Sequence, residues 1–290
     1  MAFVDSEISR QPDCWEAAAR VASERADVFP RRGERVAVVG CGSSWFMAQA
    51  YAGLREAVGA GETDAFAASE FPYNRSYDRI VALTRSGTTS EVCELLRHTS
   101  APSLAIVADD ETPATELADD TVVLDFASDA SVVMTSFATS AVAALRAHLG
   151  QDLTSAIVDA RAAVSSRLPL DPAQVEQVTF VGQGWCVGLA HEGALKAREA
   201  ATFWTESYPA MDYRHGPISI AAPNRAVWVF GEAPTGLAEQ VRDTGAVFVT
   251  SDLDPLAALI EAQRFAVDLA RHRGLDPDSP RNLSRSVILP

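Results

Sequence analysis

The sequence predicts an α/β protein built from two doubly wound parallel sheets in tandem. Two observations predict this class: short apolar runs alternate with helical stretches, and VAVVGCG (36–42) is similar to VTFVGQG (178–184). Strands that alternate with helices of these lengths form parallel sheets. The repeated strand and glycine turn indicate an internal duplication, with a chance similarity of two glycine turns as the alternative.

The first half is expected to start with a helical segment (1–34) that has room for one helix, at 12–28. A first subdomain (35–150) follows, because four apolar runs alternate with helical stretches in it. Its strands are predicted at 36–39, 80–83, 103–108 and 121–124. Its helices are predicted at 45–58, 90–98, 113–118 and 136–150.

The second half is expected to repeat this order after a helical linker (151–176), whose helix lies at 156–167 before the proline-rich LPLDP (168–172). A second subdomain (177–275) has predicted strands at 178–181, 227–230 and 247–250. Helices are predicted around 192–199, within 232–244 and at 255–274. Residues 276–290 form a C-terminal tail near the active site.

Charge and composition narrow the function classes. The net charge of −15, from 24 basic and 39 acidic residues, opposes binding to nucleic acids or anionic membranes. Four scattered cysteines show no metal-ligand spacing, and no apolar run is long enough to span a bilayer. The turn at 40–42 lacks the third glycine of a dinucleotide site. We therefore expect a reduced, cytoplasmic protein with neither a metal nor a cofactor.

A hydroxyl-rich turn, TRSGTT (84–89), lies between the strand at 80–83 and the next helix. Parallel sheets bind ligands at this edge, and the helix start adds N–H donors for an anion. A helix cap needs one hydroxyl, so several favour a phosphate-type site. The matching turn of the second half, FGEAP (230–234), has no hydroxyl. The candidate anion ligands are Ser43 and Ser44, after the first strand, and Thr84, Arg85, Ser86 and Thr89.

The segment 191–217 carries the candidate catalytic groups. Glu192, Lys196 and Glu199 are spaced to share one helix face, and His215 follows in a His-Gly-Pro turn. A carboxylate, an ammonium and an imidazole could supply a base, a charge stabiliser and a proton carrier. The alternative is a solvated Glu–Lys pair and a histidine that caps a turn, since such pairs are common.

Six motifs occur in one order along the chain: CGSS (41–44), ASEF (68–71), TRSGTT (84–89), EGALKARE (192–199), YRHGP (213–217) and PRNLSRSV (280–287). Together they resemble the sugar isomerase (SIS) domain family, whose subdomains are flavodoxin-like. The pattern is most similar to the tandem-SIS isomerase half of glucosamine-6-phosphate synthase and its free-standing relatives. The resemblance covers roughly residues 35–290.

The resemblance implies roles for the candidate residues. Ser44, Thr84, Ser86 and Thr89 match the phosphate ligands, and Arg85 stands where the family usually has glutamine. Glu199 matches the base for proton transfer, Lys196 matches a lysine that stabilises the enediol, and His215 matches a ring-opening histidine from the partner subunit of a homodimer. Arg285 stands where the synthase has a lysine. Because arginine stays protonated, Arg285 can donate to an oxygen but cannot form an imine.

These roles predict a phosphosugar isomerase or an aminosugar-6-phosphate deaminase/isomerase that binds a phosphorylated sugar or aminosugar. The alternatives are a fructosamine-6-phosphate deglycase, a non-catalytic sugar-phosphate-binding regulator and a lyase such as a sugar-acid etherase. Only a short segment precedes the first strand, so we do not expect this chain alone to carry out glutamine-dependent synthesis.

Overall fold

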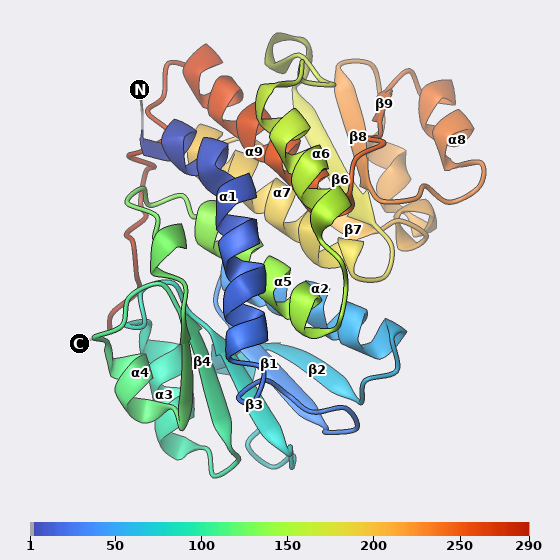
Figure 1. The fold of residues 1–290 in the computed structure, drawn as a ribbon. Coiled ribbons are helices and arrows are strands. Elements are labelled where there is room, and N and C mark those ends of the chain that lie inside the picture. The colour runs from blue at the N-terminus through green and yellow to red at the C-terminus, as the bar shows by residue number, and fades with distance from the viewer. Residues whose placement is uncertain (1–2, 290) are drawn as a thin grey trace. The chain divides into compact units, whose positions relative to one another are not determined.

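The computed structural model describes residues 3–289, which form two compact units, each with one parallel sheet (Figure 1). The first-sheet unit contains residues 10–130, 134–153 and 284–289, and the second-sheet unit contains residues 3–9, 131–133 and 154–283. The predicted α/β class with two parallel sheets in tandem is therefore confirmed. The N-terminal helix α1 (Phe3–Glu24) begins earlier than predicted and carries Pro12 within it.

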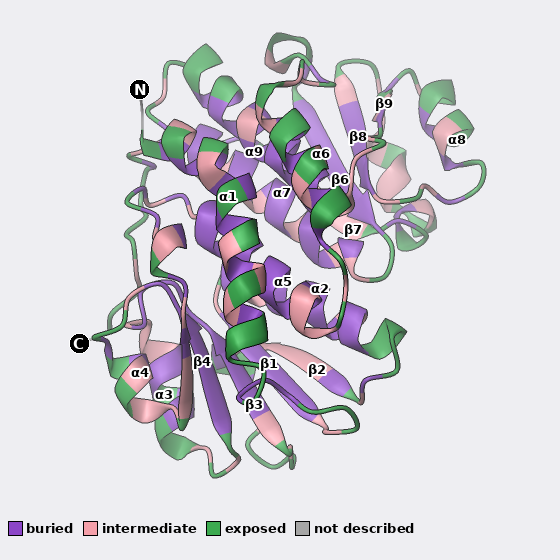
Figure 2. Cartoon of the chain, viewed as in Figure 1, coloured by how far each residue is buried: buried purple, intermediate pink, exposed green. Residues whose placement is uncertain are grey.

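The first sheet has five strands in the order β2-β1-β3-β4-β5, all parallel. Its central strands are buried along most of their length (Figure 2), which explains their continuous apolar runs. The sequence predicted four of the five and missed β2, an edge strand whose residues are mostly half-buried and include Asp64. The strands are β1 (Val36–Gly40), β2 (Thr63–Ala67), β3 (Arg79–Leu83), β4 (Ser103–Val107) and β5 (Asp120–Val123).

Helices cover both faces of the first sheet. Val92, Leu95 and Leu96 of α3 pack with Ala37 and Val39 of β1 in one apolar core, which also includes α4. Helices α2 and α5 lie on the other face (Figure 1). The helices are α2 (Ser43–Ala57), α3 (Ser90–His98), α4 (Pro113–Leu117) and α5 (Ser136–His148).

The second sheet has the order β7-β6-β8-β9, which repeats the first sheet without a fifth strand. The sequence missed β7, which pairs with β6 just as β2 pairs with β1. The strands are β6 (Gln177–Gly182), β7 (Thr205–Pro209), β8 (Arg225–Phe230) and β9 (Val247–Val249). The helices are α6 (Thr154–Ser165), α7 (Cys186–Ala201), α8 (Leu237–Asp243) and α9 (Pro255–His272).

The aromatic side chains of the second-sheet unit hold α9 against the sheet. Phe180 of β6 lies beside Trp228 of β8, with ring centroids 5.7 Å apart, and Trp228 meets Phe265 of α9 edge-on at the same distance. All three are fully buried. On the other face, Leu237 and Val241 of α8 close a smaller core over β8. Helix α7, which carries the candidate catalytic groups, packs against β6 of the same sheet.

Candidate functional site

The first-sheet unit gathers the predicted anion ligands around one small cavity of about 80 Å³. Thr84, Arg85, Ser86 and Thr89 come from the turn between β3 and α3, and Ser44 comes from the first turn of α2. Arg285 of the tail completes the polar lining, whereas Ser43 is buried but does not line the cavity. Tertiary structure therefore brings together five of the six predicted ligands. They form a candidate anion site.

Thr84 gives this cavity an unsatisfied donor. Its side chain is 3% exposed, and its Oγ1 has no hydrogen-bond partner among residues 3–289. A buried hydroxyl without a partner is costly, so such an atom in a polar cavity indicates a place for a ligand. Cys41 also lines the cavity, and burial, with a smaller effect of Glu91, raises the pKa of its thiol to about 11. Cys41 is therefore neutral and does not repel an anion.

Two glycines permit this arrangement. A Cβ atom at Gly40 would lie 2.7 Å from the carbonyl carbon of Ser44, so only glycine lets α2 start close to the end of β1. Gly87 has φ +63°, and a Cβ atom there would lie 2.0 Å from the Oγ1 of Thr112. The glycines at these turns thus bring Ser44 and the hydroxyl-rich turn to one sheet edge.

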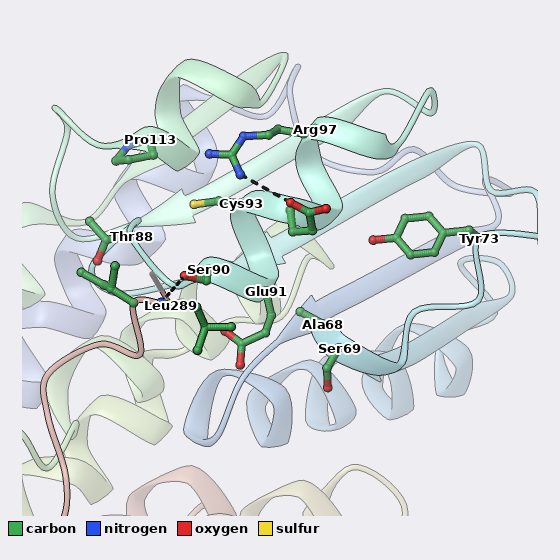
Figure 3. A pocket seen from close by; sticks show the side chains of 12 residues that line it. Ala68, Ser69, Tyr73, Thr88, Ser90, Glu91, Cys93, Arg97, Pro113 and Leu289 are labelled. Carbon is green, nitrogen blue, oxygen red and sulfur yellow. Dashed lines mark hydrogen bonds and ion pairs between the residues drawn. The ribbon is translucent and has the colours of Figure 1, made fainter.

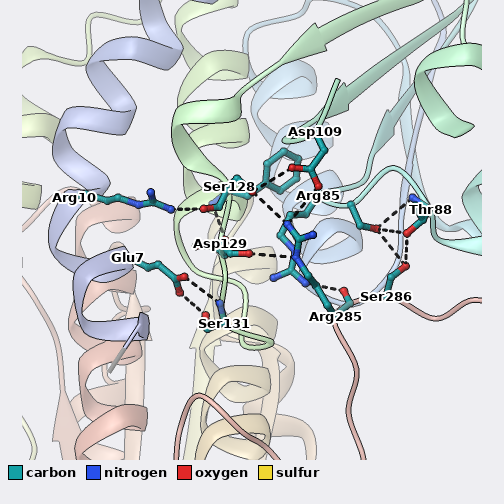
Figure 4. Close-up of polar contacts among 12 residues, drawn as sticks. Glu7, Arg10, Arg85, Thr88, Asp109, Ser128, Asp129, Ser131, Arg285 and Ser286 are labelled. Carbon is teal, nitrogen blue, oxygen red and sulfur yellow. Dashed lines mark hydrogen bonds and ion pairs between the residues drawn. The ribbon is translucent and has the colours of Figure 1, made fainter. Parts of the chain in front are cut away.

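The guanidinium of Arg285 is held by residues of its own unit (Figure 4). Its Nη2 lies 3.3 Å from Oδ2 of Asp109 and donates to Oγ of Ser128 at 3.2 Å, and its Nε donates to the carbonyl oxygen of Asp129 at 3.3 Å. The predicted catalytic group is therefore also a structural anchor of the tail. Neither Asp109 nor Ser128 stood out in the sequence, because both lie far from the tail along the chain.

A wider pocket of about 620 Å³ lies along α3 (Figure 3), and none of the predicted site residues lines it. Its wall combines acidic side chains of α3, Glu91 and Glu94, with the ring of Tyr73 and the apolar tail residues Ile288 and Leu289. The ASEF and TRSGTT motifs each contribute to its lining, but neither predicted a pocket here, because the wall comes from four separate segments of the chain.

The second-sheet unit holds the candidate catalytic groups on α7. The Nζ of Lys196 lies 2.6 Å from Oε2 of Glu199 and 3.3 Å from Oε1 of Glu192. Side-chain exposure is 1% for Lys196, 0% for Glu192 and 19% for Glu199. The solvated-pair alternative is therefore wrong, because Glu192 and Lys196 are buried.

Lys196 is the only lysine in the sequence, whose other basic residues are arginine or histidine. Burial by itself lowers the pKa of its ammonium, but the facing carboxylates of Glu192 and Glu199 outweigh this and hold the pKa above its ordinary value. Glu192, Lys196 and Glu199, here called the triad, therefore place the positive ammonium of Lys196 between two carboxylates at neutral pH.

Glu199 also borders a cavity of about 200 Å³ at the C-terminal end of α7. Thr202, which ends the helix in a left-handed conformation with φ 48°, lines the cavity together with Asp276, Ser279 and Arg281. Of the triad, only Glu199 reaches this cavity, so it is the carboxylate that a ligand can contact. Arg281 was not predicted as a site residue, although it lies within the PRNLSRSV motif.

The two histidines nearest the triad in sequence, His191 and His215, differ in burial and in side-chain contacts. His215 ends the short helix Asp212–His215 and is exposed, and its imidazole makes no hydrogen bond or ion pair within residues 3–289. His191 was not predicted; it is half-buried, and its Nδ1 lies 2.8 Å from Oγ of Ser207. Burial, and then the nearby Arg198, lower the pKa of His191, so its imidazole is neutral near pH 7.

Residues 3–289 contain no group of three His, Cys, Asp or Glu side chains placed to hold a metal ion. None of the helices in this part of the chain is long and apolar enough to cross a membrane.

Comparison with known proteins identifies relatives, although no family model matches the chain. The isomerizing glutamine–fructose-6-phosphate aminotransferase of Xylella fastidiosa (strain Temecula1) is 26% identical over 99% of this chain. The corresponding enzyme of Xanthomonas campestris is 28% identical, again over 99% of this chain. The chain spans 59% of the length of each of these curated relatives.

Solved structures show the same fold. A glucosamine-6-phosphate deaminase from Thermotoga maritima superposes with a TM-score of 0.80 at 21% identity and covers 99% of this chain and 100% of its own. The C-terminal domain of the Francisella tularensis glucosamine-fructose-6-phosphate aminotransferase gives 0.81 at 19% identity, covering 97% and 98%. The tagatose-6-phosphate ketose/aldose isomerase of Escherichia coli gives 0.77 at 18%, covering 100% and 97%.

Proposed function

We propose that this chain, a homologue of the isomerizing aminotransferases with the fold of the SIS phosphosugar isomerases, is a phosphosugar isomerase or an aminosugar-6-phosphate deaminase/isomerase. Glu199 is the base that moves a proton between the two carbons next to the sugar carbonyl. Lys196 supplies positive charge as the enediolate forms. His215 of a second copy of the chain assists ring opening. The anion site of the first-sheet unit binds the phosphate and so positions the sugar.

One observation carries this proposal. The Glu199 carboxylate contacts a buried ammonium, Lys196, and also borders an open cavity. An enediol reaction needs a base that reaches the substrate and a positive charge that is kept from bulk water. Glu192 is fully buried against the same ammonium and does not line the cavity, so it does not reach a substrate there.

The first-sheet unit supports a phosphorylated substrate. Its cavity combines the guanidinium of Arg85 with hydroxyls of Thr84, Ser86 and Thr89, and one of these hydroxyls has no partner. Guanidinium and hydroxyl donors bind phosphate oxygens through charge-assisted hydrogen bonds. An isomerase that positions its substrate by a remote phosphate has a use for this site.

A panel of sugars in deuterated water tests the proposal. Hexose 6-phosphates, aminohexose 6-phosphates and fructosamine 6-phosphates are incubated with the protein, and proton NMR follows loss of the C–H signal next to the carbonyl. We expect deuterium to enter at least one phosphorylated sugar. Ammonia released from an aminohexose would identify the deaminase, and release of another amine from a fructosamine would favour the deglycase alternative. No exchange and no product from any sugar would favour the regulator alternative.

Substitutions in the anion site should separate phosphorylated from unphosphorylated ligands. Ser86→Ala with Thr89→Ala removes two hydroxyls from the cavity. Since a hydrogen bond to a charged group contributes roughly 1.5–3 kcal/mol, we expect the phosphorylated sugar to bind at least tenfold more weakly. Isothermal titration calorimetry measures both ligands. The control is Ser76→Ala with Ser100→Ala, two exposed hydroxyls of the same unit. Equal losses for both ligands would place the phosphate elsewhere.

The single lysine predicts a route without an imine. Arg285 cannot form one, and the ammonium of Lys196 is held between two carboxylates with a raised pKa. We therefore expect borohydride added with a ketose phosphate to leave both the mass and the activity of the protein unchanged. Mass spectrometry of the intact protein checks this. A reduced sugar adduct on Lys196 would contradict the enediol route.

A further inference from the structure

We propose that residues 284–289, here called the tail segment, occupy the anion site with their own oxygen atoms and are displaced when a phosphorylated ligand binds. This inference rests on the proposed function, because it assumes that the anion site binds a phosphate. It makes the tail segment an internal competitor of the substrate.

Three consecutive residues of the tail segment supply oxygens to the site, and Figure 4 shows the first two of them, Arg285 and Ser286. The carbonyl oxygen of Arg285 accepts a hydrogen bond from Nη2 of Arg85 at 2.6 Å. The carbonyl oxygen of Val287 accepts one from the backbone N–H of Ser90, at the start of α3, at 3.1 Å. Between them, the hydroxyl oxygen of Ser286 lies among the side chains of the turn.

The surroundings of the Ser286 hydroxyl resemble those expected for an anionic oxygen. Ser86 and Thr88 donate to it at 3.2 Å and 3.0 Å, and Oγ1 of Thr89 lies 3.4 Å away. A guanidinium, several hydroxyls and a helix N-terminal amide are the donors that bind phosphate oxygens in proteins. The tail segment therefore uses the donors that a phosphate would need, so both cannot be fully bound at once.

The size of the remaining cavity agrees with a partly filled site. Small-molecule sites enclose roughly 300–1,000 Å³, whereas the cavity beside Thr84 encloses about 80 Å³. A hexose 6-phosphate needs more room than this. Withdrawal of Arg285 from the lining, and of Ser286 from the adjoining turn, would supply it. The donors that the tail segment now uses would then become free for the ligand.

The tail segment is held in a way that permits displacement. Its apolar side chains bury little surface: Val287 is 53% exposed, Ile288 68% and Leu289 61%. Since little apolar surface is buried, polar contacts supply most of the interactions that keep the tail segment in place. Besides the oxygens described above, these include the ion pair between Arg285 and Asp109 at 3.3 Å, whose side chains are 40% and 38% exposed.

Two variants of the full chain weaken this hold from different sides. Ser286→Ala removes the hydroxyl that lies in the site, and Asp109→Asn weakens the anchor of Arg285 without touching the hydroxyl-rich turn. We expect both to bind inorganic phosphate and glucose 6-phosphate at least threefold more tightly than the wild type in calorimetry. The matched control is Ser284→Ala, whose hydroxyl donates to the carbonyl oxygen of Ser286 and not to the turn, and it should stay within 1.5-fold.

Trypsin supplies a readout of the tail itself, because it cleaves after Arg285. We expect saturating phosphate to speed cleavage of the wild type at this bond, since the ligand releases the tail segment. A lid that closes over the ligand would show the opposite sign, with slower cleavage.

The two readouts separate failure of this inference from failure of the proposed function. Suppose that Ser86→Ala with Thr89→Ala weakens phosphate binding, whereas Ser286→Ala leaves it unchanged or weakens it too. This result overturns the inference about the tail segment but leaves the proposed function standing. Slower cleavage with phosphate does the same. If neither the wild type nor any variant binds phosphate or glucose 6-phosphate, the anion site itself is refuted, and this inference with it.

Discussion

Replacing Glu199 with glutamine should lower the rate of C–H exchange at least 100-fold while the fold is retained. A positioned general base contributes about 10²–10⁴-fold to the rate, and a carboxamide of the same shape cannot accept the proton. The fold should tolerate the change, because the Glu199 side chain is 19% exposed and Lys196 keeps its second carboxylate, Glu192. NMR in deuterated water, with the most active sugar phosphate of the panel, measures the rate.

The matched control for this substitution is Glu239→Gln. Glu239 is an exposed carboxylate on α8 of the same unit, so its variant should exchange at the wild-type rate. Thermal unfolding of both variants shows whether the fold is kept. Exchange by a folded Glu199→Gln protein at the wild-type rate would remove Glu199 as the base.

Replacing Lys196 with methionine should destabilise the protein by about 3–5 kcal/mol, which is typical when one partner of a buried ion pair is lost. The variant removes the ammonium that faces Glu192, whose side chain is 0% exposed. A buried carboxylate deprived of its counter-charge is costly, because it has given up its hydration. Urea unfolding of the wild type and the variant measures the difference.

The double variant Glu192→Leu with Lys196→Met tests the cause. It removes both buried charges and replaces them with apolar side chains of similar size, a change that is often neutral or stabilising. We therefore expect it to recover most of the stability lost in the single variant. If the double variant is no more stable than the single one, lost packing rather than an uncompensated charge explains the effect.

The sequence alone determined the class of fold, and it predicted most of the polar side chains that the structure gathers around the anion site. The apolar runs of β1, β3 and β4 are continuous because these strands are buried, and such continuous runs predict buried strands from sequence. The edge strands β2 and β7 were missed because they are mostly half-buried, and β7 contains Glu206 and Ser207. Because these strands lie at the edge of a sheet and not in a core, their residues lack the continuous apolar pattern that predicts a buried strand.

Only the tertiary structure decided how the predicted residues are used. The spacing of Glu192, Lys196 and Glu199 predicted that they share one helix face. The structure shows that Glu192 and Lys196 are buried and that, of the two carboxylates, only that of Glu199 borders a cavity. In the same way, the sequence placed Arg285 in a tail, and the fold anchored it to Asp109 and set Ser286 among the hydroxyls of a turn about 200 residues away. Periodicity encodes local geometry, whereas burial and contacts between distant segments depend on how the whole chain packs.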